Sequence, residues 1–275
     1  IIIVYKMKRF LLLICLVVLA TSQDWDYKKG GDDWDAYSQC MNGAQAPINI
    51  LLENTSPLDP KYYFYPKTNN NVKGSLQHEQ GGNLLVLNFT EKDNVLGLVD
   101  YEDDWGRQTQ NCSAIFFKLP GEHTFEDEGR PEMELQLNCS IFSQSTLSST
   151  FVSIPVKLTK DESEQSTFFN SLKTIVDQQI DENKLPVDIT VDTFGDLMDG
   201  FSVLDGAYIY EAQVNFPPCA TSVNYIYIHR YLKVGQSLYD QLKKCLKSDK
   251  VNPDTGNARN LQDETEVVEI GVFQA

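Results

Sequence analysis

Three ionisable side chains stand close together at the end of an apolar run, in the stretch "IFFKLPGEH" (115–123). Lys118 interrupts bulky, β-prone residues where a strand should still be buried, and Glu122 and His123 follow after Leu-Pro-Gly. A buried ammonium needs a partner of opposite charge and further hydrogen bonds. The chemistry of this stretch therefore depends on which group accompanies Lys118.

Motifs of common enzyme classes are absent from the sequence or stand in an unsuitable context. There is no Gly-rich phosphate loop, no Gly-x-Ser-x-Gly elbow and no His-Glu-x-x-His motif. The Asp-Thr-Gly tripeptide at 254–256 matches aspartic proteases, but it occurs once, in a polar loop. The acidic stretch 100–106 lacks the ligand spacing of a calcium loop. His78, His123 and His229 are far apart in sequence, which disfavours a three-histidine metal site.

Strand signals dominate the chain, because Val, Ile, Tyr and Phe alternate with polar residues in several short runs. The clearest predicted strands are 82–89, 112–119, 132–139, 151–158, 207–214 and 223–232. Two segments, 163–181 and 235–247, have apolar residues at helical spacing, and lysines near the end of the second suit the helix dipole. These elements predict one mainly-β domain with peripheral helices.

The first residues have the pattern of a secretory signal peptide. Lys6, Lys8 and Arg9 precede an apolar run at 10–20, and small residues follow at the cleavage spacing. The alternative, a membrane anchor, is disfavoured because the run is too short to span about 30 Å of hydrocarbon. We therefore expect residues 1–22 to be a signal peptide with upstream residues, 23–275 to form a single domain, and the mature chain to lack a membrane span.

Charge and cysteine content narrow the environment and the partners. The formal net charge is -16 at pH 7, which disfavours nucleic acid as a partner because phosphate contacts need Lys and Arg. Of six cysteines, Cys15 lies in the predicted signal peptide, so five remain. A secreted chain can form disulfides, and an odd number of cysteines leaves at least one thiol free or bonded to another chain. Among four Asn-x-Ser/Thr sequons, Asn54 in "LLENTSPLDP" is the best glycosylation candidate, whereas Asn88 and Asn138 lie in predicted strands.

Several stretches, in order along nearly the whole mature chain, resemble motifs of the α-carbonic anhydrase family. "WDYKKGGDDW" (25–34) is similar to the family's Trp-x-Tyr with a later Trp, and "CMNGAQAPINI" (40–50) to its Gln-Ser-Pro-Ile-Asn stretch. Further matches lie in "FFKLPGEHTFEDEGRPEMELQL" (116–137), "YIYEAQVNFPPCATSVNYIYI" (208–228) and "NARNLQ" (257–262). The resemblance implies an α-carbonic anhydrase-like fold, mainly β: a large twisted, mostly antiparallel sheet with short peripheral helices.

The resemblance also locates the family's zinc site, and this sequence differs from it at every ligand. In the family, two histidines on one strand and a third on the neighbouring strand bind zinc, because alternation points all three at one ion. Those positions carry Phe116, Lys118 and Gln136 here. Phenylalanine has no lone pair, a lysine cation repels Zn²⁺ and an amide oxygen is a poor zinc ligand, so we expect neither a metal nor another cofactor.

Other positions that the resemblance assigns to the site are either altered or retained. The family's hydroxyl gate falls on Asn215, the next residue is Phe216, and the proton-shuttle position falls on Asn83. Two acids are retained: Glu122, which partners the gate in the family, and Glu134, which orients the third ligand. Zinc hydration chemistry needs a metal-bound water with a pKa near 7. The combined changes predict a pseudoenzyme with no catalytic residues.

The family's geometry implies a partner for Lys118. If positions 116 and 136 face each other, Lys118 lies opposite Glu134, and the two are expected to form a cross-strand ion pair. In this hypothesis the ammonium replaces the cation that the family's fold holds. The alternative is that Lys118 extends along a wide, hydrated cavity.

The resemblance implies a disulfide between Cys40 and Cys219, which pair in secreted members of the family; the alternative is two buried thiols. We make no pairing prediction for Cys112, Cys139 and Cys245. The inferred register places Cys112 and Cys139 on opposite faces of the sheet, which argues against a bond between them.

The predicted function is that of a secreted, non-catalytic protein that acts through protein–protein contacts, with a partner and an oligomeric state that the sequence does not identify. The alternative is an enzyme of another chemistry that reuses the carbonic anhydrase cleft, although no nucleophile and base can be named for it. A structural or matrix role, in which acidic residues contact calcium or carbonate mineral, is a weaker third interpretation.

Overall fold

The chain is represented by a computed structural model, which describes residues 24–58, 62–65, 71–90, 96–103, 106–140, 149–192, 194, 197, 207–219, 222–263 and 270–273. The predicted signal peptide with its upstream residues, 1–22, lies outside these ranges. Within them, no helix combines the length and the apolar composition needed to cross a lipid bilayer.

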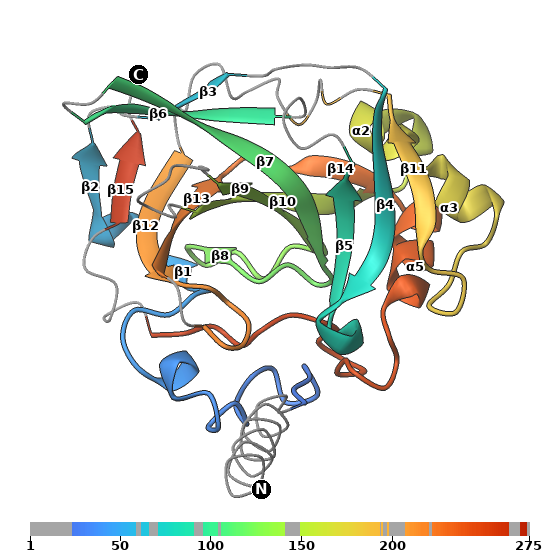
Figure 1. The fold of residues 1–275 in the computed structure, drawn as a ribbon, viewed down its shortest axis with the longest axis horizontal. Coiled ribbons are helices and arrows are strands. Elements are labelled where there is room, and N and C mark those ends of the chain that lie inside the picture. Colours follow the sequence, from blue (N-terminus) through green and yellow to red (C-terminus); the bar gives the residue numbers. More distant parts are fainter. Residues whose placement is uncertain are drawn as a thin grey trace, which may run out of the picture.

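The described residues build one twisted sheet of 13 strands, which curves around the middle of the molecule in Figure 1. Along its main path the strand order is β11-β4-β5-β7-β9-β10-β13-β12-β15-β2, while β14 pairs with β10 and β3 pairs with β6, which also pairs with β7. The strands are β2 Thr55–Leu58, β3 Tyr62–Tyr65, β4 Val72–Glu79, β5 Leu84–Phe89, β6 Leu96–Asp103, β7 Gly106–Lys118, β9 Met133–Ser140, β10 Ser149–Thr159, β11 Val187–Val191, β12 Ala207–Gln213, β13 Ser222–Ile228, β14 Leu232–Gly235 and β15 Ile270–Phe273. Most neighbours are antiparallel, as predicted, but β10 is parallel to β13 and β14, and β15 to β2.

Short elements surround this sheet. A two-stranded parallel sheet joins β1 (Asn49–Ile50) to β8 (Thr124–Phe125). The helices are η1 Ser38–Met41, η2 Leu52–Asn54, η3 Gln80–Gly82, η4 Glu162–Glu164, α2 Thr167–Asn170, α3 Lys173–Asp177 and α5 Gln236–Cys245. Helices α2, α3 and α5 lie together at one side of the molecule, at the right of Figure 1.

The long helix predicted for 163–181 is wrong, because that segment forms the separate short helices η4, α2 and α3. The break falls at Ser171, whose hydroxyl accepts a hydrogen bond from the backbone N–H of Asp192, 2.9 Å away. Phe168 and Phe169 are adjacent in sequence and both fully buried. A tertiary contact and a wide buried surface therefore override the helical spacing of the sequence.

Alternating side chains form a hydrophobic core on each face of the sheet. In β9, Leu135 and Leu137 belong to a core that also contains Phe168 of α2. Phe116 of β7 belongs to the opposite core, which contains Tyr27 from the N-terminal segment. Because both faces are buried, the central strands have long apolar runs with few polar positions. The polar residues that do occur on the second face are those of the candidate site.

A β-bulge in β7 overturns the expectation that Cys112 and Cys139 lie on opposite faces. The β7–β9 register pairs Ala114 with Asn138 and then shifts, so that Cys112 pairs with Cys139. The bulge adds one residue, Ser113, to β7 without a counterpart in β9, which turns Cys112 back to the face of Cys139. The two cysteines form a disulfide. Counting alternate residues along the strand assigned Cys112 to the wrong face, because a bulge interrupts the alternation.

The remaining cysteines and the glycosylation candidate have clear positions. Cys40 and Cys219 form the second disulfide, as the resemblance implied. Cys245, at the end of α5, is a buried free thiol, and burial raises its pKa to about 12. Asn54 is exposed at the end of η2; its glycosylation stays a prediction.

Candidate functional site

Two neighbouring strands place the predicted site residues on one face of the sheet. The β7–β9 register pairs Phe116 with Gln136 and Lys118 with Glu134, which confirms the predicted facing positions. Because directly opposed residues of antiparallel strands point to the same side, these four side chains share the face of the second core. The strands are central in the sheet, so the backbone that carries the site is fixed from both sides.

Lys118 forms its ion pair with Glu122, which corrects the expected pairing with Glu134. The Lys118 Nζ lies 2.9 Å from Glu122 Oε1, and both side chains are 0% exposed. The ammonium also donates to the hydroxyl of Tyr27 at 2.8 Å and lies 4.8 Å from the centre of that ring. Alternation along strands could not reveal this pairing, because β7 ends at Lys118 and the following turn brings Glu122 back over it.

The Glu122 carboxylate accepts hydrogen bonds from four donors. Its Oε1 accepts from Lys118 Nζ and from the backbone N–H of Arg259, at 2.9 and 2.8 Å. Its Oε2 accepts from Gln136 Nε2 at 3.1 Å and from Asn215 Nδ2. The carboxylate is thereby held in one orientation by four different parts of the chain. Each donor offsets part of the cost of burying its charge.

The Glu134 carboxylate is occupied by a different set of donors. Its Oε2 accepts from the backbone N–H groups of Glu122 and His123, at 3.0 and 2.9 Å. Its Oε1 lies 2.8 Å from His123 Nδ1 and accepts from Gln136 Nε2 at 2.8 Å. Burial opposes ionisation of Glu134, but the charge and hydrogen bonds of His123 outweigh it and lower the carboxyl pKa to about 2. With its oxygens so occupied, Glu134 is not the partner of Lys118.

His123 links this carboxylate to the next strands. Its Nε2 lies 2.5 Å from the hydroxyl of Tyr210 in β12, while its Nδ1 faces Glu134. The ring also lies 5.7 Å from the Tyr225 ring of β13. All three side chains are buried. Burial raises the pKa values of both tyrosines well above their usual range, so these hydroxyls stay neutral and act as hydrogen-bonding groups.

Burial and pairing also have opposite effects on the pKa of Lys118. Burial lowers the pKa of its ammonium, and the charge and hydrogen bond of Glu122 act in the opposite direction. The net pKa lies below the ordinary value of 10.5. The 2.9 Å contact between Nζ and Glu122 Oε1 has the geometry of a charge-assisted hydrogen bond, with the carboxylate as the acceptor.

Aromatic side chains close over the ammonium. The ring of Phe216 lies 5.7 Å from that of Phe116, 6.5 Å from that of Phe151 and 6.4 Å from that of Trp25. The Lys118 Nζ lies 6.0 Å from the centre of the Phe216 ring. The polar side chains beneath these rings, which we call the polar floor, are sealed from solvent: Lys118, Glu122, Glu134, Gln136 and Asn215 are all fully buried.

A shallow depression of about 250 Å³ remains outside this aromatic closure. Its lining is mainly apolar and consists of Asn138, Ser149, Phe151, Val214, Phe216, Pro218, Cys219 and Val223. Since Lys118 and Glu122 are not among the lining residues, a molecule in this depression would meet rings and aliphatic carbons rather than charge.

The residues at the positions that the resemblance assigns to zinc ligands do not fit a zinc ion. Phe116 offers only a ring, Lys118 brings a positive charge, and the oxygen of Gln136 accepts from Asn215 Nδ2 at 3.0 Å. In the part of the chain that the structure describes, no three His, Cys, Asp or Glu side chains are grouped to hold a metal. No step of metal chemistry can be derived from this arrangement.

The predicted gate and shuttle positions separate in the structure. Asn215 joins the polar floor through Glu122 and Gln136, and Phe216 belongs to the aromatic closure. Asn83 is buried beside η3, where its side chain donates to the carbonyl of Gln80 at 2.8 Å. This bond holds the Asn83 side chain within its own turn, apart from the residues around Glu122.

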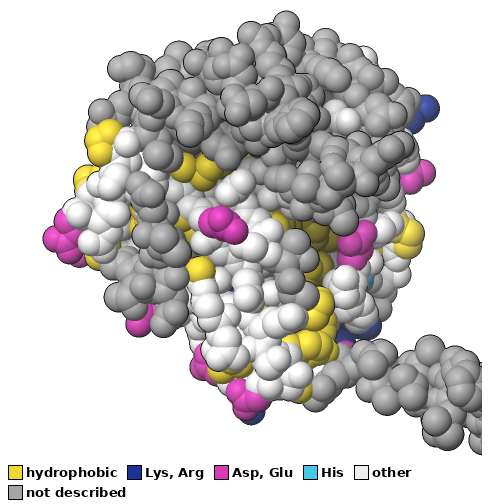
Figure 2. Space-filling view, turned by 60° about the vertical axis from the view of Figure 1, so that its left-hand side comes forward, with side chains coloured by type: hydrophobic (Ala, Val, Ile, Leu, Met, Phe, Trp, Pro, Cys, Tyr) yellow, Lys and Arg dark blue, Asp and Glu magenta, His cyan; other side chains and the backbone are white. Residues whose placement is uncertain are grey.

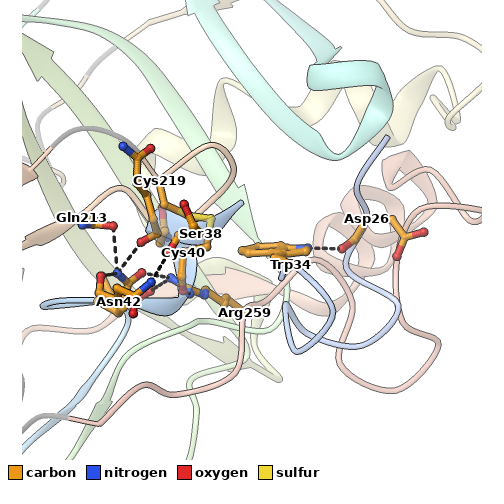
Figure 3. Close-up of a disulfide and its surroundings, with 12 residues drawn as sticks. Asp26, Trp34, Ser38, Cys40, Asn42, Gln213, Cys219 and Arg259 are labelled. Carbon is orange, nitrogen blue, oxygen red and sulfur yellow. Dashed lines mark hydrogen bonds between the residues drawn. A yellow bond between two sulfur atoms is a disulfide. The ribbon is translucent and has the colours of Figure 1, made fainter. Parts of the chain in front are cut away.

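Arg259 connects the site to the Cys40–Cys219 disulfide (Figure 3). Its guanidinium donates to the carbonyls of Cys40 and Ala46, at 2.7 and 2.8 Å. Its guanidinium carbon lies 5.2 Å from the Trp34 ring. Together with its backbone bond to Glu122, these contacts make Arg259 one of the residues that hold the N-terminal loop against the polar floor.

Sequence reasoning assigned no role to Tyr27, His123 or Arg259, although signals for all three were present. Each lies in a stretch that carried the family resemblance: Tyr27 in "WDYKKGGDDW", His123 in "FFKLPGEHTF" and Arg259 in "NARNLQ". Their roles depend on contacts between residues far apart in the chain, such as the Lys118–Tyr27 bond across 91 positions. The alternation of side chains within one strand does not predict such contacts.

Comparisons with known proteins agree with this architecture. The family model described as eukaryotic-type carbonic anhydrase matches residues 29–268. Dioscorin, solved in complex with ascorbate, superposes with a TM-score of 0.68 at 18% identity, covering 92% of this chain and 98% of that one. The α-carbonic anhydrase of the fungus Aspergillus oryzae gives a TM-score of 0.66 at 20% identity, covering 88% and 94%. That of Photobacterium profundum gives 0.65 at 17%, covering 90% and 99%.

No curated protein matches the chain significantly. The solved structures are too distant in sequence to indicate more than a common fold. The family match is more specific, because it extends over most of the chain and includes both strands of the candidate site. The chain therefore belongs to the eukaryotic-type carbonic anhydrase family.

Proposed function

We propose that this chain is a secreted carbonic anhydrase-like pseudoenzyme that binds another protein instead of hydrating CO₂. The observation that carries the proposal is the Lys118–Glu122 pair, 2.9 Å apart and fully buried, at a zinc-ligand position of the fold. The ammonium brings its own positive charge to the retained carboxylate. A second cation at the same place would be repelled and would find no competent ligand set.

The surroundings of the pair support the same proposal. Glu122 accepts from four donors, and Glu134 is occupied by His123 and Gln136, so neither carboxylate is available as a general base without breaking this network. Phe216 closes the space above the ammonium. A reaction would need a substrate within hydrogen-bonding reach of an acid or base, and the floor is sealed against one.

The disulfides and the sealed floor support secretion and protein binding. Two disulfides are compatible with an oxidising compartment. A sealed floor directs recognition to the outer surface, where a protein partner makes its contacts. Dioscorin, a neighbour in fold, was solved with ascorbate; binding of a small molecule in the depression beside Phe216 is therefore the alternative outcome of the test.

The test combines metal content, activity and binding on the secreted chain. We expect elemental analysis to find far less than one zinc per chain after incubation with zinc, and CO₂ hydration at the background rate. The matched control is Lys118→His, which changes a ligand position without completing the site. Zinc close to one per chain, lost on changing Phe116 or Gln136, would contradict the pseudoenzyme proposal. Turnover without metal, or an ordered small molecule beside Phe216, would instead favour the reuse of the cleft.

A further inference from the structure

An amine, a carboxylic amide and a carboxylate meet in the buried polar floor. The Lys118 Nζ lies 2.9 Å from Glu122 Oε1, and the side-chain amide of Asn215 donates from Nδ2 to Glu122 Oε2. All three side chains are fully buried. One carboxylate therefore contacts both the amine nitrogen and the amide nitrogen, which is the position that a proton carrier between these two groups must occupy.

The surroundings of the amine favour its uncharged form. In Figure 2 the charged side chains that face the viewer are scattered over the surface, where water stabilises them, whereas the Lys118–Glu122 pair is 0% exposed. The rings of Tyr27 and Phe216 lie 4.8 and 6.0 Å from Nζ. Burial lowers the pKa of the ammonium, which favours transfer of a proton from Nζ to Glu122. The neutral amine that results is a nucleophile, and the rings exclude water from it.

Two amides contact Glu122, and Asn215 is the better electrophile. The Gln136 amide donates to Glu122 Oε2 at 3.1 Å and to Glu134 Oε1 at 2.8 Å, and its oxygen accepts from Asn215 at 3.0 Å. Among the described residues, the buried Asn215 Oδ1 finds no hydrogen-bond donor. A buried carbonyl oxygen without a donor is costly. A protonated Glu122 supplies a donor beside this amide, and such a bond polarises the Asn215 carbonyl for attack at Cγ.

We propose that Lys118 and Asn215 form an intramolecular isopeptide bond, with Glu122 as the proton carrier. The lone pair of Lys118 Nζ attacks Asn215 Cγ, the new carbon–nitrogen bond forms, and the bond between Cγ and Nδ2 breaks. The Lys118 ammonium loses two protons. One passes to Nδ2, which leaves as ammonia, and the other stays on Glu122 as a neutral carboxylic acid. The reaction therefore removes both charges of a buried pair, whose desolvation is costly.

The ion pair described above is the state from which this bond forms. An outside substrate does not reach the sealed floor, but both reacting groups already lie inside it, and the hydrogen bonds that Glu122 gives up are those to the reacting groups. The bond joins the end of β7 to the segment after β12, close in sequence to the Cys219 disulfide. The inference goes beyond the proposed function, because it requires neither a partner nor secretion.

Peptide mapping by tandem mass spectrometry of the folded full chain tests the proposal. After incubation at neutral pH, the chain is denatured, reduced and digested with trypsin. We expect a branched peptide that joins the Lys118 and Asn215 segments, lighter than their sum by one ammonia, and uncleaved after Lys118. Mapping is needed because the mass of the whole chain would also register ammonia lost elsewhere. Recovery of both residues only in linear, unmodified peptides overturns the inference, and a branch to Gln136 overturns the assignment to Asn215.

Variants test the role of each group. Lys118→Met and Asn215→Ala should give no branched peptide, whereas Lys157→Met makes the first change at an exposed lysine and should leave the yield unchanged. Glu122→Gln keeps the side-chain size but cannot carry protons, so bond formation should slow by about 100-fold or more. An unchanged rate in Glu122→Gln that is folded by circular dichroism, or an equal yield in urea-unfolded chain, would contradict the mechanism. Mapping of the unchanged chain decides whether the bond exists, however the variants fold.

Discussion

Replacing Lys118 with methionine tests whether the ammonium balances a buried charge. Methionine keeps most of the side-chain length but removes the charge that lies 2.9 Å from Glu122. The carboxylate keeps its bonds from Arg259, Gln136 and Asn215 but loses its cation. Removing one partner of a buried ion pair costs about 3–5 kcal/mol. We therefore expect Lys118→Met to lower the free energy of unfolding by an amount in that range.

Urea denaturation and thermal melting both measure this loss. For a chain of this size each kcal/mol corresponds to about 2–4 °C, so a fall in Tm of roughly 6–20 °C is expected. Urea is preferred to guanidinium, because a charged denaturant screens ion pairs. The measurements should be made under non-reducing conditions, so that both disulfides remain intact.

A double-mutant cycle identifies the partner. Lys118→Met combined with Glu122→Gln should cost less than the sum of the two single changes, with a coupling above about 1 kcal/mol. The same cycle with Glu134→Gln should give a much smaller coupling, because Glu134 is held by His123 and Gln136. Loss of less than about 1 kcal/mol in Lys118→Met would mean that the lysine is solvated. Strong coupling to Glu134 alone would refute the assigned pair.

Three further predictions concern acid stability, metal binding and the second disulfide. The pKa of Glu134 is about 2 in the folded chain against an ordinary value of 4.5, so its stabilisation, about 3 kcal/mol, is complete above pH 4.5 and is lost as the pH falls toward 2. Urea midpoints at pH 7 and pH 3 should show more than half of this loss in the unchanged chain and a smaller one in Glu134→Gln; equal losses would contradict it. The triple change Phe116→His, Lys118→His and Gln136→His should create zinc binding measurable by calorimetry, and a folded triple variant that ignores zinc would show that these positions do not converge. Non-reducing peptide mapping should recover Cys112 linked to Cys139, and the double serine variant should lose about 3–4 kcal/mol, since the bond closes a loop with a separation of 27 residues; recovery of free thiols would refute the link.

Much of the site could be predicted from the sequence, because its positions follow strand alternation and the order of the family motifs. The facing of Phe116 and Gln136 and the Cys40–Cys219 bond were both predicted, and both are present. Their prediction needed only the period of a strand or the resemblance of a motif. The partner of Lys118 was predicted incorrectly, because alternation identifies the residue across the strand and not the one that a turn brings over it.

The features that could not be predicted depend on a bulge and on tertiary contacts, neither of which produces a repeating pattern in the sequence. A single extra residue at Ser113 changes the facing of Cys112. The bond from Lys118 to Tyr27 joins the sheet to the N-terminal segment, and the break at Ser171 depends on a contact with Asp192. The last two are tertiary interactions, in which the second partner is distant in the chain or lies on another element.

Arg259 also has a consequence for the order in which the protein is assembled during synthesis. Its guanidinium binds the carbonyls of Cys40 and Ala46, and its backbone N–H binds Glu122. The ribosome makes the loop around Cys40 well before Arg259, which lies 219 residues later in the sequence. Contacts of such large sequence separation form late. A nascent chain that stops just short of Arg259 therefore contains Cys40 and Cys219 but lacks the clamp that holds the Cys40 loop in place, and its thiols remain open to incorrect pairing.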